Sequence, residues 1–145
     1  MDPMLVETTL ERAKQMIAQL ISFHPLQPSD DDYAKVFVGD AAARARAGYQ
    51  GLWGAVPPWP GRASQTEIHV AGALAQDFAA DLPRARFFPG GYKEIGHLLV
   101  PDVLWLMWEQ VTPGERDGIT FDGLVPIDDR WAWFPKPWRV VLPSP

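Results

Sequence analysis

The sequence predicts an α+β fold in which N-terminal helices pack on one face of a curved four-stranded antiparallel meander. Apolar residues recur every three or four positions over about 4–82, which is typical of helices. From about 92 to 142 they recur every two positions, which is typical of strands. Glycine and proline clusters separate these segments. The 145 residues are enough for one core, so we expect a single domain over 1–145.

Two helices are expected first. One covers 4–22 and ends before Pro25, because the residue preceding a proline is disfavoured in the helical region. The other covers 29–54 and begins with a serine and three aspartates, which are favoured at helix starts. Gly39 is expected to break it into two pieces.

The segment that follows the proline-rich loop is predicted to form a third helix over 65–81. Ser64 and Glu67 fit a capping box at its start, and apolar residues continue one face as far as Pro83. A strand at 66–70 is the alternative, because threonine, isoleucine and valine favour strands.

Four antiparallel strands are then expected at 92–100, 103–111, 118–127 and 130–142. Two-residue turns at 101–102 and 128–129, and a longer connection at 112–118, join them. Pro135 and Pro137 interrupt the last strand, because proline cannot donate to the hydrogen-bond ladder.

The register set by these turns predicts an apolar sheet face that the helices cover. His97 is the ionisable residue on this face away from the strand ends. Aromatic side chains from the helices lie opposite it, so the pattern predicts a pocket between helices and sheet. The expected lining is Tyr33, Tyr49, Trp53, His97, Trp108 and Phe121.

The opposite face of the predicted sheet mixes large apolar side chains with carboxylates. Its members are Glu94, Trp105, Met107, Glu109, Asp122, Trp131 and Trp133. Such a mixture suits a surface that a second copy or another protein covers. The alternative is that the same chain covers these tryptophans. A shift of one residue in register would exchange the two faces.

Few residues suggest chemistry. The absence of cysteine excludes disulfides and cysteine–zinc sites. His24, His69 and His97 do not have metal-ligand spacing, so we expect no metal and no cofactor. His97 is a candidate general base, with a structural core histidine as the alternative. A function without catalysis is therefore preferred.

Charge and hydropathy exclude two other classes of partner. The net charge is -5 and no cluster of lysine and arginine contradicts it, so we expect no nucleic-acid binding. The first residues lack the pattern of a secretory signal, and no apolar run approaches about 18 residues. We expect a cytoplasmic protein that does not span a membrane.

Two stretches suggest a family resemblance, because they belong to a predicted layout in which helices precede a curved meander. They are DYAKVFVGDAAARARAGYQGLW (32–53) and GLVPIDDRWAWF (123–134). This layout resembles the NTF2-like (SnoaL-like) superfamily of α+β cones. The resemblance implies a pocket between the helices and the concave sheet face, and dimerisation through the other face. It implies no residue roles, because that superfamily has no universal catalytic motif.

Three functions remain open. The first is a binding protein whose pocket takes a small apolar ligand, with a homodimer formed through the sheet. The second is a protein-partner module of the inhibitor or immunity type that uses the tryptophan and carboxylate face. The third is an enzyme with His97 as general base. The first is preferred.

Overall fold

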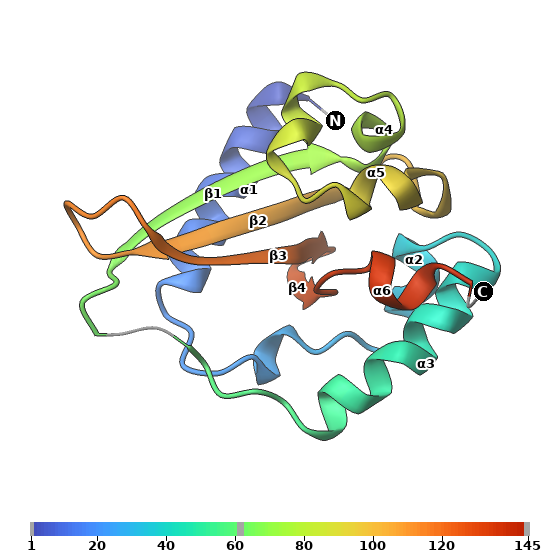
Figure 1. Cartoon of the computed structure of the whole chain (residues 1–145), viewed down its shortest axis with the longest axis horizontal. Helices are drawn as coiled ribbons and strands as arrows, with labels where there is room; N and C mark the ends of the chain where they lie inside the picture. Colours follow the sequence, from blue (N-terminus) through green and yellow to red (C-terminus); the bar gives the residue numbers. More distant parts are fainter. Residues whose placement is uncertain (1, 61–62, 144–145) are drawn as a thin grey trace.

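The computed structural model describes residues 2–60 and 63–143 and confirms an α+β fold with helices ahead of an antiparallel sheet (Figure 1). The sheet has the order β1-β2-β3-β4, with strands β1 (Glu67–Leu74), β2 (Leu104–Val111), β3 (Gly118–Ile127) and β4 (Arg130–Trp133). The α-helices are α1 (Pro3–Ile17), α2 (Asp32–Val36), α3 (Asp40–Gly54), α4 (Ala75–Ala79), α5 (Gly91–Ile95) and α6 (Trp138–Val141). The described residues also form the 3-10 turns η1 (His24–Leu26), η2 (Pro83–Phe87) and η3 (Gly96–Leu98).

Helix α1 confirms the first predicted helix, although it ends at Ile17 rather than at residue 22. Asp2 caps it, because the backbone N–H of Met4 donates to Asp2 Oδ1 at 2.7 Å. Its buried stripe faces the sheet and contains Val6, Thr9, Ala13 and Ile17. Within the described ranges, no helix is long and apolar enough to cross a membrane.

Helices α2 and α3 together replace the second predicted helix and confirm the break at Gly39. This residue has a φ of +50°, in the left-handed region that favours glycine. The chain therefore turns between the two helices. Helix α3 then places Ala41, Ala45 and Tyr49 in the core.

Helices cover both faces of the sheet, so the expected single helical layer is split in two (Figure 1). Helix α1 and turn η1 pack on one face, against a cluster that includes Leu106, Trp108 and Leu124. Helices α2 to α6 pack on the opposite face, where Trp105 and Val125 are central. The sheet is the middle of three layers.

The predicted helix over 65–81 is wrong for its first half, where the alternative strand forms instead. Strand β1 pairs with β2 along its whole length. Gly72 has no side chain for a reason that its surroundings show, because a Cβ would come within 2.8 Å of Leu106 Cδ2 and 3.0 Å of Leu10 Cδ2. Glycine at this position lets helix α1 approach the sheet closely.

The first predicted strand, over 92–100, is also wrong, because this segment forms α5 and η3. The buried residues Tyr92, Ile95 and Leu99 recur at intervals of three and four, which is the helical period. Leu99 then makes an isolated bridge with Phe37 rather than a hairpin with β2. Strand β1 takes the place beside β2.

The three later strands are confirmed as β2, β3 and β4, but β4 ends at Trp133 instead of continuing to residue 142. Ile127 pairs with Arg130, which confirms the predicted two-residue turn at 128–129. The prolines at 135 and 137 follow the last paired residue, as expected for residues that cannot extend the ladder.

Gly123 forms a β-bulge that the predicted register does not contain. Met107 lies opposite Asp122, whereas the preceding residue Leu106 lies opposite Leu124, so Gly123 has no partner on β2. Its φ is +90°, again in the region that favours glycine. One extra residue in a strand exchanges the faces of all residues after it.

An ion pair between the buried Asp32 and the partly exposed Arg130 joins the start of α2 to the start of β4. Arg130 donates to both carboxylate oxygens of Asp32, from Nη2 to Oδ1 at 2.6 Å and from Nη1 to Oδ2 at 2.9 Å. The backbone N–H of Ser29 also donates to Oδ2, at 2.8 Å. The Arg130 hydrogen bond is the main reason why the pKa of Asp32 falls from 3.8 to about 2.

We expect Asp32→Asn to remove a pH-dependent part of the stability. Because the folded pKa lies below the unfolded one, the ion pair stabilises the fold above about pH 5, and this is lost as the pH falls from about 4 to 2. The contribution is about 1–2 kcal/mol, below the full value for this shift because Arg130 is partly exposed to solvent. Urea unfolding at neutral and acidic pH measures it, and an unchanged pH slope in the variant would contradict it.

Candidate functional site

A cleft opens beside the half of β3 that β4 does not reach. Strand β4 pairs with β3 only from Leu124 to Ile127, so the first half of β3 has no strand on that side in the described chain. The chain then leaves the sheet and returns as α6, next to α3 (Figure 1). The cleft has a volume of about 450 Å³. Its lining comes from α3 (Gly48, Tyr49, Leu52), from β3 (Thr120, Phe121, Asp122) and from the C-terminal segment (Trp133, Pro135, Lys136, Arg139, Val140).

Helix α3 fixes the C-terminal wall of this cleft through two hydrogen bonds. Tyr49 Oη donates to the carbonyl oxygen of Pro135 at 2.8 Å. Arg44 Nε donates to the carbonyl oxygen of Val141 at 2.6 Å. The wall is therefore held at both ends, before and after α6.

Asp122 is the polar centre of the floor. Its Oδ1 accepts a hydrogen bond from Tyr92 Oη at 2.7 Å and another from the backbone N–H of Lys136 at 2.8 Å. Its carbonyl oxygen accepts a bond from Trp133 Nε1 at 2.8 Å. Lys136 has a φ of +48°, and the bond to Asp122 helps to hold this unusual conformation. Asp122 thus links β3, β4, α5 and the C-terminal wall.

The tyrosine hydroxyls near the cleft act as hydrogen-bond donors. Burial and then the nearby Asp122 charge raise the pKa of both Tyr49 and Tyr92 well above the ordinary value. Both phenols stay protonated at neutral pH. Neither is suited to take a proton from a substrate.

The lining of the cleft combines an apolar surface with two cations. Leu52, Phe121, Trp133 and Val140 are among the apolar residues of the lining, whereas Lys136 and Arg139 supply positive charge. This combination can hold an apolar body beside a polar or charged head group.

Two of the residues predicted to line a pocket, Tyr49 and Phe121, line this cleft. Three others lie immediately behind it. Tyr33 is stacked on Tyr49 at 6.3 Å between ring centroids, Trp53 meets Trp133 edge-on at 6.2 Å, and Trp108 is stacked on Phe121 at 4.8 Å. These three support the lining rather than forming it.

The position predicted for His97 is wrong. It lies in η3 and is exposed, because the segment is helical and turns Tyr92 and Ile95 inward instead. The other histidines, His24 and His69, are also exposed. In the described part of the chain, no group of three or more histidine, cysteine, aspartate or glutamate residues is placed to hold a metal ion.

The seven residues predicted to share one sheet face do not do so. The bulge leaves Trp105 on the face covered by α2 to α6 and moves Trp131 and Trp133 to the face covered by α1. Trp105 is 0% exposed and Trp133 is 6% exposed. Met107, Glu109 and Asp122 remain on the side of Trp105, and Glu94 lies on α5. The continuous surface of tryptophans and carboxylates that was expected to bind a partner does not form. Binding of a protein partner or of a second copy therefore stays a prediction.

Lys136 and Arg139 were not singled out from the sequence. The available signal was the Pro135–Lys136–Pro137 triplet, in which two restricted residues fix the direction of the backbone around one lysine. Arg139 had no such signal. It reaches the cleft only because the chain folds back against α3.

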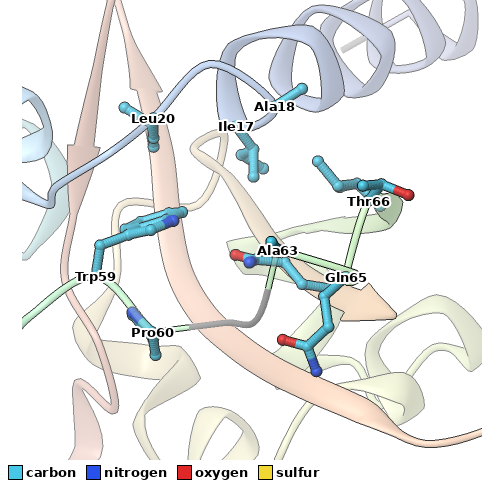
Figure 2. Close-up of a pocket in the computed structure, with 10 residues that line it drawn as sticks. Ile17, Ala18, Leu20, Trp59, Pro60, Ala63, Gln65 and Thr66 are labelled. Carbon is cyan, nitrogen blue, oxygen red and sulfur yellow. The ribbon is translucent and has the colours of Figure 1, made fainter. Parts of the chain in front are cut away.

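A second hollow of about 380 Å³ lies between the end of α1, the loop around Trp59 and the start of β1 (Figure 2). Trp59 forms one wall and packs against Phe23 at 4.7 Å and Phe121 at 6.1 Å between ring centroids. Pro60 and Ala63 also line it, and they flank residues outside the described ranges. We therefore base the candidate site on the cleft beside β3.

Comparisons with protein-family models, with curated proteins and with solved structures found no match for this chain.

Proposed function

We propose that the protein is a non-enzymatic binding protein that holds a small, largely apolar molecule in the cleft between α3, α6 and β3. The observation that carries this proposal is an apolar cleft whose C-terminal wall is fixed by hydrogen bonds to α3 and to Asp122. A wall that is already ordered lowers the entropic cost of binding. The volume of about 450 Å³ falls within the usual range of small-molecule pockets, about 300–1,000 Å³.

The polar groups around the cleft support binding rather than catalysis. The Tyr49 hydroxyl is already used as a donor to the chain, and Asp122 Oδ1 already accepts two hydrogen bonds. General acid–base catalysis needs a group within hydrogen-bond reach of the substrate and free to exchange a proton. His97, the base considered from the sequence, is not among the residues that line the cleft.

The same cleft is our candidate for the pocket that the NTF2-like resemblance implies. That pocket would lie between helices and sheet, as this one lies between α3, α6 and β3. Tyr49 and Phe121 belong both to the pocket lining expected from the sequence and to the lining of this cleft. His97 was expected in the lining, but residues of the C-terminal wall line the cleft instead.

Amide chemical shifts of the ¹⁵N-labelled protein test the proposal. We titrate it with naphthalene-2-carboxylate and, separately, with its neutral analogue naphthalene-2-carboxamide. Saturable shifts are expected for the amides of Leu52, Phe121 and Val140, with a Kd of about 1 mM or lower for at least one probe. Absence of saturable shifts with both probes, or shifts centred on Trp59 and Gln65, would rule the cleft out as the binding site.

We expect Leu52→Gln to weaken binding of the tighter probe about tenfold, because it removes apolar surface from the wall of the cleft. Leu82→Gln is the matched control, since Leu82 is an exposed leucine outside the cleft. Circular dichroism checks that both variants are folded. Equal effects of the two substitutions would contradict the proposal.

A further inference from the structure

Two cations meet at the C-terminal wall of the cleft in a chain whose net charge is -5. Lys136 and Arg139 lie one turn apart, since the N–H of Arg139 donates to the carbonyl oxygen of Lys136 at 3.0 Å. Both residues are exposed and both line the cleft. Hydrogen bonds to Tyr49, Arg44 and Asp122 hold the wall that carries them, so the backbone of both residues is fixed in position.

These two cations have no carboxylate partner among the ion pairs of the described residues. Four basic residues elsewhere in the described chain do have one, because Lys35, Arg86, Lys93 and Arg130 each lie within 4.0 Å of an aspartate oxygen. Asp122 is the carboxylate that lines the cleft, and its Oδ1 is engaged by Tyr92 and by a backbone N–H. The cleft thus has two positive charges against one negative charge.

We propose that the cleft binds an amphipathic carboxylate, with its apolar body against Leu52, Phe121 and Trp133 and its carboxylate at Lys136 and Arg139. This inference rests on the function proposed for the cleft and adds the chemical class of the ligand. The guanidinium of arginine presents paired donors that match a carboxylate, and lysine adds a point charge.

The acid and the amide used above form a matched pair for the test, because they share the naphthalene body and differ in charge. Their Kd values are measured from amide shifts in the wild type and in K136Q, R139Q and the double variant. Arg84→Gln is the control for each single variant, since it removes one positive charge at an exposed site outside the cleft. Both cleft residues are exposed, so the glutamine variants are expected to fold, and circular dichroism tests whether they do.

We expect the wild type to prefer the acid about tenfold, and the double variant to bind both probes equally. Arg84→Gln should keep the preference. Rising salt should weaken binding of the acid and leave the amide unchanged.

Equal affinity for the two probes in the wild type would overturn the carboxylate assignment and leave the binding function intact. A preference that survives in the double variant, or that is lost equally in Arg84→Gln, would also overturn it. Failure of both probes to bind would remove the proposed function, and this inference with it.

Discussion

Replacing Gly123 by alanine should destabilise the fold by about 2–5 kcal/mol or prevent folding. The residue has a φ of +90°, and a side chain in left-handed backbone costs about 1–2 kcal/mol. A Cβ at this position would also overlap the carbonyl group of Phe134 and the Cα of Pro135. Both obstacles are backbone atoms that cannot rotate away, and overpacking of this kind costs about 1–3 kcal/mol more. The bulge would have to open, and with it the floor of the cleft.

Gly114→Ala is the matched control for this substitution. Gly114 has a similar φ of +88°, but no atom lies within 4 Å of the position that its Cβ would take. Its alanine variant should therefore lose only the backbone part, about 1–2 kcal/mol. Urea unfolding of the two variants separates conformational strain from overlap. If both substitutions cost the same, the close approach of residue 134 to Gly123 does not matter for stability.

Gly123 also shows which part of the sheet could be predicted from sequence. The turn at 128–129 sets the pairing of β3 with β4, so Leu124 opposite Trp133 follows directly from it. Met107 and Asp122, which were predicted to share one face, do share it and lie opposite each other. Between Asp122 and Leu124 lies Gly123, which has no partner on β2. The connections at either end of β3 give no sign of this unpaired residue. Every face assignment beyond that residue was consequently reversed.

The two wrong segments, 67–74 and 92–98, exchanged roles because each carries two periodicities. Ala71, Gly72 and Ala73 weaken the strand pattern of β1, but Gly72 is small because helix α1 and the sheet meet there, and Ala73 belongs to the core on the opposite face. In the other segment, Ile95 belongs both to an alternating pattern and to a helical one with Tyr92. Tertiary packing decides such cases, because it determines which set of side chains can be buried.

The candidate site was predictable only where it depends on aromatic residues of helices and strands. Tyr49 and Phe121 stand out by periodicity, and both line the cleft. Lys136 and Arg139 lie after the last strand, where no period applies. Their place beside α3 depends on two hydrogen bonds, from Tyr49 to Pro135 and from Arg44 to Val141. The bonded residues are separated by 86 and 97 positions in the chain. Contacts of that kind have no local sequence signal.

Replacing Trp133 by alanine should cost about 3–5 kcal/mol of the free energy of unfolding, the range for a buried large aromatic residue. The indole lies parallel to the ring of Phe23, with 4.1 Å between centroids and 4° between planes. It meets Trp53 edge-on, and its Nε1 donates to the carbonyl oxygen of Asp122. Truncation leaves a cavity between the sheet and η1 and removes one wall of the cleft. Urea unfolding measures the loss.

Trp131→Ala is the informative comparison, because Trp131 lies on the same strand face but is only half-buried. Its truncation should cost about 1–2 kcal/mol, since less apolar surface is lost from the core. Light scattering on both variants, alongside the wild type, distinguishes burial within the chain from burial against a partner. A Trp133→Ala protein that stays as stable as the wild type but changes from dimer to monomer would show that Trp133 serves an interface. A large loss of stability with no change in mass would show that the aromatic residues of β4 stabilise the chain's own core, so that any partner surface must lie elsewhere.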